Sequence, residues 1–576
     1  MRGLEGAETL PQSNSPTRRG WRSGPVPAIL KCLMVAIVVC LGWLVLSISK
    51  HKVSSTSAAR TDIKSTAKPS GPFHWQQCGT DPHYLCGYLT VPLDYTNQSD
   101  PRTANISTVL YQQRPGKKSE KTLVIEPGGP GGSGTTMLWN KGKRFGEMYT
   151  DGQLDVLGFD PRGVNLSSPS ISCFPHDAYR DRWRWLVQSW PEVSGYDTLN
   201  RMDAINEATL RACEDKYGDI PRFLTTAFVA RDVDAIREAL GEDTLTAFMV
   251  SYGTGIGQTY AQMFPDRVGN VALDGMEFVR DGWTPWGWSV TSLDNVTDAF
   301  EDGLIGECVR AGPKGCALAM DELQSDDVYE SAREALSSKV HTLIQSTKQR
   351  PISGVSSQGA GIVSYENLVE WLYHLLYQPP NWKSGVQALA ELENGNATLV
   401  LEEFHKTLWT FDPSKKRSSP QSSELEMMVL CGDSADAEQK SLAWWKDLHV
   451  NMTAKSWISG SSRLSATLPC RHFKWQPAEI YRGGFNNTLR NPLLLIGGPY
   501  DPATPLRNGR RLAKEMGNNA RMLVHHGYGH SSARDLSACS NAVIQAYILN
   551  GTVPQTAEVH CHADKKPFDA DFLGVP

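Results

Sequence analysis

The sequence lacks the features of several common protein classes. Lys and Arg number 57 against 62 Asp and Glu, a net charge of −5, so no basic excess suggests a nucleic-acid partner. No cysteines form a Cys-x-x-Cys pair, so a zinc knuckle is not expected. No Gly-Lys-Ser/Thr follows the glycine-rich stretch 127–134, which disfavours a phosphate loop. What remains is a chain of 576 residues with 40% hydrophobic residues, a globular composition too long for one simple domain.

One uncharged apolar run stands near the N-terminus, at residues 32–48. It reaches about 20 residues if the three residues before Lys31 are included and Lys31 snorkels, which is enough to cross a bilayer. We expect a signal anchor at 28–49, between a disordered tail at 1–27 and a stalk rich in Ser, Thr, Ala and Lys at 50–72. The alternative is a cleaved signal peptide, whose apolar region usually spans about 7–15 residues.

The residues beyond this run indicate where the body of the protein lies. Ten of the twelve cysteines follow the run, an even number that suits an oxidising compartment. All eight Asn-x-Ser/Thr sequons also follow it. N-glycosylation is therefore expected at Asn97, Asn105, Asn165, Asn295, Asn396, Asn451, Asn486 and Asn550. We expect a single-pass type II membrane protein with a luminal or extracellular body, or a secreted protein if the signal is cleaved.

Alternating strands and helices predict an α/β fold with a mostly parallel sheet. The expected strands are 87–95, 106–112, 122–125, 155–159, 246–250, 268–273, 492–496 and 521–524. Between about 281 and 475 this rhythm is lost, and helical stretches separated by polar loops follow one another. We interpret 73–280 and 476–576 as two parts of one sheet domain, and 281–475 as a helical lid inserted into it.

Ser251 stands where a strand turns sharply into a helix. The apolar strand 246–250 precedes it, and glycines at 253, 255 and 257 open the helix that follows. Such a turn lifts the hydroxyl above the sheet edge, as the nucleophile of an α/β-hydrolase requires. Gly253 is expected there because a side chain would strike the strand. The usual glycine two residues before the serine is replaced by Met249, and a plain strand–turn–helix is the alternative interpretation.

A serine nucleophile needs a histidine base and an acid that orients the histidine. In α/β-hydrolases the acid and then the histidine follow the serine, on loops after late strands. Asp501 and His530 each follow one of the last two expected strands, so both are placed at the sheet edge where active sites form. His525 and His526 compete for the role of base but lie nearer the strand end, and Asp535 is the second choice of acid.

The developing oxyanion of the substrate needs hydrogen-bond donors. One candidate is the backbone N–H of Tyr252, which follows the serine. The other is expected in the glycine loop after strand 122–125, at Gly129, because five glycines within residues 126–134 expose backbone N–H groups.

These motifs together resemble the secreted tripeptidyl aminopeptidase-like α/β-hydrolases, relatives of the proline iminopeptidases. The similar stretches are spread over residues 75–568: Pro127-Gly-Gly-Pro-Gly-Gly-Ser-Gly134, Gly158-Phe-Asp-Pro-Arg-Gly163, Ser251-Tyr-Gly-Thr254, Leu273-Asp-Gly275, Leu376-Tyr-Gln-Pro-Pro-Asn-Trp382, Asp501-Pro-Ala-Thr-Pro505, Gly527-Tyr-Gly-His530 and the tail 539–561. The resemblance implies serine catalysis without a metal or cofactor, and the cleavage of short peptides from a free N-terminus. Two departures are Met249, where the family has glycine, and Glu126, where it usually has a neutral residue.

The same resemblance, together with nearest-neighbour pairing, suggests five disulfides, although sequence alone does not prove their connectivity. The suggested pairs are Cys78–Cys86, Cys173–Cys213, Cys308–Cys316, Cys431–Cys470 and Cys539–Cys561.

The sequence thus predicts a serine hydrolase that acts as an exopeptidase on short peptides. An esterase or lactonase acting on a small ester is the alternative, because this fold hosts both chemistries. A non-catalytic binding protein is the third hypothesis, and Met249 is its only support. An exopeptidase needs carboxylates near its site to hold the substrate ammonium, and Glu126, Glu391 and Glu393 are the candidates. The sequence does not indicate an oligomeric state.

Overall fold

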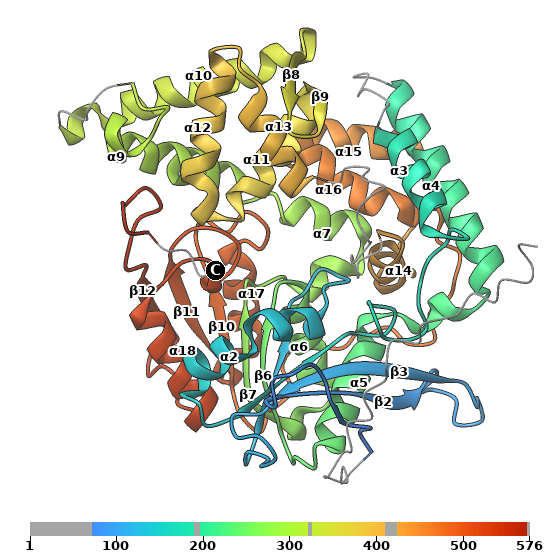
Figure 1. Cartoon of the computed structure of the whole chain (residues 1–576). Helices are drawn as coiled ribbons and strands as arrows, with labels where there is room; N and C mark the ends of the chain where they lie inside the picture. Colours follow the sequence, from blue (N-terminus) through green and yellow to red (C-terminus); the bar gives the residue numbers. More distant parts are fainter. Residues whose placement is uncertain (1–71, 189–195, 321–324, 409–422, 573–576) are drawn as a thin grey trace, which may run out of the picture. The chain divides into compact units, whose positions relative to one another are not determined.

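The computed structural model describes residues 72–188, 196–320, 325–408 and 423–572 (Figure 1). All of them lie in one compact unit of the chain, Ser65–Pro576. The apolar run 32–48 and its flanking tail and stalk lie outside the described residues. Within the described ranges, no helix is both long enough and apolar enough to cross a bilayer.

Ten strands of the described part form one sheet, in the order β1-β2-β3-β5-β4-β6-β7-β10-β11-β12. The pairs from β1 to β5 are antiparallel and the pairs from β5 to β12 are parallel, as the alternating strands and helices predicted. The strands are β1 Gln76–Gln77, β2 Tyr84–Pro92, β3 Thr103–Tyr111, β4 Thr122–Glu126, β5 Asp155–Phe159, β6 Leu245–Val250, β7 Val268–Asp274, β10 Leu493–Gly497, β11 Ala520–His526 and β12 Glu558–His562.

Helices follow most of the parallel strands and then make up the segment between β7 and β10. They are α2 Gly134–Thr150, α3 Asp177–Gln188, α4 Tyr196–Tyr217, α5 Thr226–Ala239, α6 Tyr252–Met263, α7 Pro285–Thr291, α8 Val296–Asp298, α9 Gly306–Gly315, α10 Tyr329–Gln349, α11 Tyr365–Leu376, α12 Trp382–Glu393, α13 Thr398–Thr407, α14 Ser423–Asp433, α15 Leu442–Lys455, α16 Gly460–Thr467, α17 Leu506–Met516 and α18 Ala538–Asn550.

Both faces of the parallel sheet are buried. Helices α2 and α18 pack on one face, where Leu123 and Ile125 of β4 join their cluster. Helices α5, α6 and α17 pack on the other face, where Val124 of the same strand lies. Successive side chains of a strand point to opposite faces, so a strand covered on both sides must be apolar throughout. This explains why the strands appeared in the sequence as short unbroken apolar runs.

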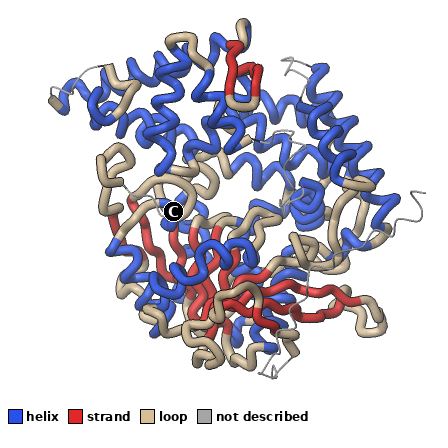
Figure 2. The backbone as a smooth tube through the Cα atoms, in the orientation of Figure 1, coloured by secondary structure: helices blue, strands red, loops and turns tan. Residues whose placement is uncertain are grey.

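The lid forms a helical layer beyond the carboxyl edge of the sheet, with its own hydrophobic core (Figure 2). Two features differ from the expectation. The lid contains an antiparallel hairpin, β8 Ile352–Ser356 and β9 Gly359–Val363. Helix α4, expected in the sheet domain, packs instead with the lid, since Leu199 is buried beside Trp445 and Leu468. Figure 1 shows α3 and α4 alongside α15 and α16.

Five disulfides join the pairs expected from the sequence. They are Cys78–Cys86, Cys173–Cys213, Cys308–Cys316, Cys431–Cys470 and Cys539–Cys561. Disulfides persist in oxidising compartments, so these bonds favour a secreted or extracellular location for this unit.

Candidate active site

Ser251 occupies the tight turn between β6 and α6. Its backbone has φ 59° and ψ −127°, a conformation that few residues other than glycine adopt and that is associated with functional sites. The Ser251 N–H donates to the carbonyl of Asp274 at 3.0 Å, and the Ser251 carbonyl accepts from the Thr254 N–H at 2.8 Å. The structure therefore shows the sharp strand-to-helix turn that the sequence predicted.

Glycines let the loop after β4 lie directly against this turn. A Cβ at Gly128 would stand 2.5 Å from the Val250 carbonyl and 2.7 Å from the Ser251 Cβ. A Cβ at Gly253 would stand 3.1 Å from the backbone oxygen of Glu126, but only 2.0 Å from its carboxylate. A side chain at residue 253 would thus strike strand β4, as expected, and it would clash most severely with the buried Glu126 carboxylate.

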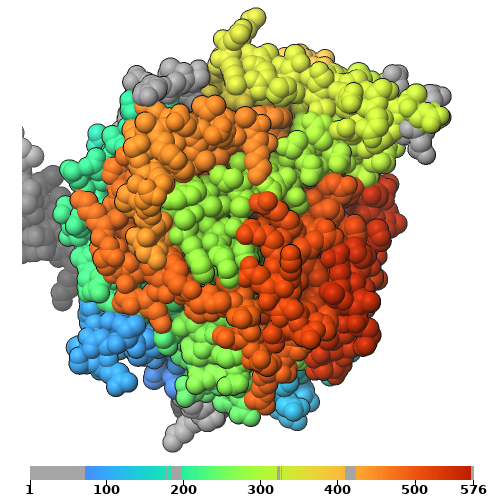
Figure 3. Space-filling view, turned by 180° about the vertical axis from the view of Figure 1, so that it is seen from behind, coloured from blue at the N-terminus to red at the C-terminus, as the bar shows by residue number. Residues whose placement is uncertain are grey.

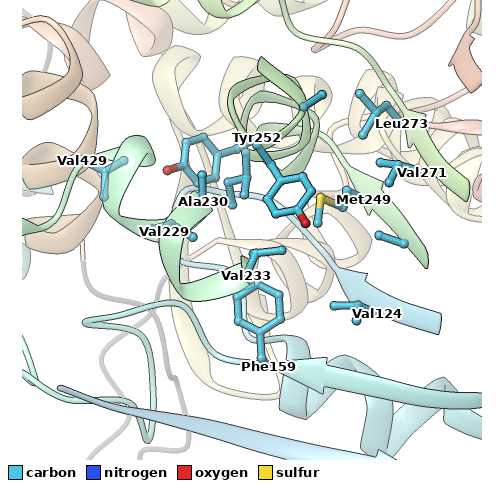
Figure 4. Packing of buried hydrophobic residues seen from close by; sticks show 14 of the residues in the cluster. Val124, Phe159, Val229, Ala230, Val233, Met249, Tyr252, Val271, Leu273 and Val429 are labelled. Carbon is cyan, nitrogen blue, oxygen red and sulfur yellow. The ribbon is translucent and has the colours of Figure 1, made fainter. Parts of the chain in front are cut away.

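Met249 points into the core on the α5 and α6 side of the sheet, where Figure 4 shows it with Val271 and Leu273. It is fully buried, and its sulfur would lie 3.2 Å from a Cβ at Gly257. Because methionine is flexible and fills irregular spaces, a side chain larger than glycine is accommodated here without displacing the turn.

Met249→Gly is therefore expected to keep the enzyme active while lowering its stability. Truncating a buried methionine costs about 2–5 kcal/mol, and glycine in a strand adds about 0.5–1 kcal/mol. Fluorophosphonate labelling per folded molecule and urea unfolding measure the two effects. Met522→Gly, at a buried position in β11, is the matched control. A wild type without labelling that gains it in Met249→Gly would identify the natural protein as a binding module.

Asp501 and His530 meet on the loops after β10 and β11. His530 Nδ1 lies 3.0 Å from each carboxylate oxygen of Asp501. The carboxylate also accepts from the N–H groups of Ala503, Thr504 and Ser531 at 2.8–3.0 Å and from the Thr504 hydroxyl at 2.8 Å. Burial alone would raise the pKa of Asp501, but His530 and these donors hold it below its usual value. Asp501 is thus ionised and fixed beneath the imidazole.

The rival residues have other partners. Asp535 pairs with His525 at 2.5 Å and accepts from the N–H of Tyr528. His525 also meets the Ser540 hydroxyl at 2.8 Å, so both of its ring nitrogens are engaged within the core. His526 stacks on His562 at the outer side of the sheet. The structure therefore separates these residues from the Asp501–His530 pair.

Asp274, at the end of β7, connects the serine turn to the histidine loop. Its backbone oxygen holds the Ser251 N–H, and its carboxylate accepts from the N–H and hydroxyl of Ser532 at 3.0 and 2.7 Å. A Cβ on the next residue, Gly275, would stand 3.3 Å from His530 Cε1. Ser251 is thus hydrogen-bonded to Asp274, and His530 lies beside the next residue, Gly275. From the sequence, Asp274 is identified only as part of the motif Leu273-Asp-Gly275 that follows an expected strand, with no role assigned to it.

Neither of the two expected oxyanion donors is shown giving its backbone N–H to another residue of the described ranges. Glu126 accepts the Gly128 N–H at 2.8 Å, whereas the Gly129 N–H donates to no described residue. Tyr252 is the first residue of α6, where a backbone N–H has no partner within the helix. Gly129 and Tyr252 therefore remain the candidate donors.

A lid segment covers His530. The His530 N–H donates to the carbonyl of Tyr377 at 3.3 Å, and the two rings meet edge to face at 5.1 Å. A Cβ at Gly529, whose φ is +83°, would stand 2.5 Å from Pro379. The lid motif 376–382 noted in the sequence is therefore the part of the lid that rests on the histidine loop.

The three carboxylates proposed to hold an ammonium differ in position. Glu126 is buried beside the serine turn, and its Oε1 has no hydrogen-bond partner among the described residues. Burial raises its pKa to about 8, although the Gly128 N–H lowers it. Glu393 pairs with Lys339, and Glu391 accepts from Asn396, both at the far end of α12. Glu391 and Glu393 thus bind partners within the lid. Two other carboxylates, Glu277 and Asp433, line a cavity beside Tyr252 and are not among the candidates that the sequence suggested.

Comparison with known proteins supports the same chemistry. Residues 121–309 match the alpha/beta hydrolase fold family and residues 456–561 match the TAP-like protein family. The chain carries an α/β-hydrolase domain and a TAP-like domain. It is similar to serine protease Hip1 of Mycobacterium tuberculosis strain H37Rv, 28% identical over 84% of this chain and 90% of that protein.

Two further relatives have different activities in their names. The tripeptidyl aminopeptidase of Streptomyces lividans is 26% identical over 86% of this chain and 87% of that protein. Carboxylesterase B of Mycobacterium tuberculosis strain H37Rv is 26% identical over 82% of this chain and 85% of that protein. Together these relatives and the fold make the chain a serine hydrolase. They include both peptidases and an esterase, so they leave the substrate class open.

Proposed function

We propose that this serine hydrolase is an exopeptidase that acts on short peptides with a free N-terminus. The observation that carries the proposal is the Asp501–His530 pair, whose loop Asp274 connects to the strained Ser251 turn and on which a lid segment rests. A lid over the histidine loop limits the length of chain that can reach the serine. Relatives named as a serine protease and a tripeptidyl aminopeptidase support a peptide substrate.

In this proposal Ser251 attacks the scissile carbonyl carbon while His530 takes the hydroxyl proton. The N–H groups of Gly129 and Tyr252 donate to the oxyanion. His530 then gives its proton to the leaving amine, and the acyl-enzyme remains on Ser251. Water, deprotonated by His530, hydrolyses this ester and restores the serine. Asp501 accepts a hydrogen bond from Nδ1–H throughout and stabilises the imidazolium.

The test compares three substrates on one preparation: a free tripeptide arylamide, its N-acetylated form and a simple aryl ester. N-acetylation removes a charge and leaves the carboxylate that paired with it without a partner. We expect turnover of the free peptide and a loss of at least about 100-fold in kcat/KM after acetylation, equivalent to about 2.7 kcal/mol. Equal cleavage of both peptides would keep the peptidase but reject recognition of the N-terminus.

An esterase or lactonase is the second candidate, supported by the relative named Carboxylesterase B. It would use the same serine, histidine and aspartate. Rapid hydrolysis of the aryl ester with no cleavage of either peptide is the result that would favour it over the exopeptidase.

We also propose that the body is N-glycosylated and anchored by the apolar run 32–48. Six of the eight sequon asparagines are exposed, all except Asn165 and Asn295. The Asn165 amide nitrogen donates to the Asp160 carboxylate at 2.9 Å and is half-buried, so a glycan there would break an internal hydrogen bond.

We therefore expect Asn105→Gln to remove one glycan from the protein made in the secretory pathway, and Asn165→Gln to remove none. Intact-mass measurement before and after enzymatic deglycosylation separates the two variants.

The protein should also stay in the membrane pellet after an alkaline carbonate wash. A soluble product beginning near residues 54–61 would show instead that the signal is cleaved.

A further inference from the structure

A small cavity lies beside the serine turn, on the side of Tyr252. It has a volume of about 40 Å³, measured as the space open to the centre of a water-sized sphere. A single water needs roughly 10–15 Å³ by this measure, so the cavity admits an ammonium group with a carbon or two, but no large side chain. Its walls include Tyr252, Glu277, Trp283, Trp288, Asp433 and Tyr481.

Segments far apart in the sequence build this cavity. They are the start of α5, helix α6, the turn after β7 with helix α7, the end of α14, Thr467 of α16 and residues 480–482. In the view of Figure 3 the light-green residues around 280–300 meet the orange residues of the 425–490 segment on one face of the molecule. Tyr252 is both a wall of the cavity and the residue after Ser251, so the cavity borders the helix that begins at the serine turn.

Glu277 is one of the residues that line this space. Its Oε2 accepts from the indole N–H of Trp288 at 3.3 Å, and Oε1 has no hydrogen-bond partner among the described residues. A Cβ at Gly255 would lie 2.1 Å from Oε1, so the glycine pattern of α6 makes room for Glu277 at residue 255 as it does for Glu126 at residue 253. Glu277 is therefore held in place by packing, with one oxygen left for a ligand.

Asp433 is the second carboxylate of the cavity. It accepts from the backbone N–H and the hydroxyl of Thr226, at the start of α5, and so it also has a structural role. The Thr226 hydroxyl meets the Tyr252 hydroxyl at 2.7 Å, which connects Asp433 to the serine turn. Arg482, a cation in the lining, donates to the Asp436 carboxylate and to the Asp433 carbonyl, and it lies over the Trp283 ring.

Acidic and basic groups both surround the cavity: Glu277 and Asp433 line it, while Arg280 and Arg482 lie over the Trp283 ring and Arg463 lies over the Trp288 ring. Burial raises the pKa of Glu277 to about 8; the Trp288 hydrogen bond and Arg463 lower it, while Asp433 and Glu126 raise it. Burial likewise raises the pKa of Asp433 to about 6, against the Thr226 donors and Arg482. A ligand cation would relieve the repulsion between the carboxylates of Glu277 and Asp433.

We propose that this cavity binds a primary ammonium group of the substrate through Glu277 and Asp433, with Trp283 and Trp288 beside it. The proposal rests on the proposed exopeptidase, for which it assigns the site of the N-terminal ammonium. A lysine side chain carries the same ammonium group and is the other possible source. The small volume favours an ammonium close to the chain being cleaved.

The experiment measures binding without turnover, by calorimetry on the Ser251→Ala protein. The ligands are a trialanine amide, its N-acetylated form and N-acetyl-lysine amide. We expect the free trialanine amide to bind, and acetylation or Glu277→Gln to weaken that binding by about 10–100-fold, as for the loss of a hydrogen bond to a charged group. Glu242→Gln is the matched control, since Glu242 is another buried carboxyl group but precedes β6, at the opposite end of that strand from Ser251.

The pH dependence of the affinity is a second test, and it uses the protein with Glu277 unchanged. Between pH 7.5 and 5.5 the peptide amine stays mostly protonated, while the Glu277 carboxylate becomes protonated below its pKa of about 8. Affinity for the trialanine amide should therefore fall as the pH falls, by up to about tenfold per unit, and the acetylated ligand should show no such dependence.

The outcomes separate this proposal from the proposed function. Equal binding of free and acetylated trialanine amide, or unchanged binding in Glu277→Gln, would overturn the ammonium site even if the wild type cleaves peptides. Selective binding of N-acetyl-lysine amide would assign the cavity to a side chain instead. Glu277-dependent binding of the free peptide, with no peptide cleavage by the wild type, would keep the site and reject the exopeptidase.

Discussion

Asp501→Asn is expected to lower turnover of any substrate by about 10⁴-fold while leaving the fold intact. The asparagine keeps an oxygen that can accept from the Ala503 and Thr504 N–H groups, so the loop geometry is preserved. Its amide, however, can donate to His530 Nδ1 and thereby favours the wrong imidazole tautomer. The loss also includes the negative charge that stabilises the imidazolium in the transition state.

The measurement is single-substrate kinetics with the aryl ester, supported by fluorophosphonate labelling. Ser251→Ala should abolish labelling, since it removes the atom that the probe modifies. Asp535→Asn is the control, because that carboxylate pairs with His525 and makes no contact with His530. If Asp535→Asn lost activity by orders of magnitude and Asp501→Asn did not, our assignment of the acid would be wrong.

The sequence predicted the parallel sheet well because its signal is local. Strands such as β5 and β10 are short apolar runs, buried on both faces, and the loops after them carry glycine, proline and aspartate. Asp501 could be predicted because it lies on the loop after a late strand, and the acid of an α/β-hydrolase follows the serine there. Its carboxylate also accepts the N–H groups of Ala503 and Thr504.

Contacts between distant segments could not be predicted in this way. Leu199 and Trp445 are brought together by the packing of α4 on the lid, and no periodic pattern records that contact. The same is true of Glu277 and Asp433, which are separated by most of the lid yet line one cavity. Glu391 and Glu393 are candidates beside Glu126 on the sequence alone, because the sequence shows the lid only as a segment. The structure places both at the end of α12 with lid partners.

The Gly158-Phe-Asp-Pro-Arg-Gly163 motif has a structural role that explains its arginine. Arg162 is fully buried and forms two bonds of 2.7 Å to the Asp232 carboxylate. Its Nη1 also donates to the carbonyls of Leu93 and Phe223, both at 2.9 Å. The pair thus joins the loop after β5 to helix α5 and the end of β2. The Arg162 guanidinium and the Asp232 carboxylate are both buried, so water cannot replace any of these hydrogen bonds.

Asp232→Ala should lower the free energy of unfolding by about 3–5 kcal/mol, because it leaves the Arg162 charge buried without its partner. The double variant Arg162→Met, Asp232→Leu should lose less, since no charge is then buried. Arg102→Ala is the control: the exposed Arg102–Asp219 pair has the same 2.7 Å separation but should contribute no more than about 1 kcal/mol. Urea unfolding midpoints measure all three variants. A double variant as unstable as the single one would show that the ion pair itself, rather than the stranded charge, accounts for the loss.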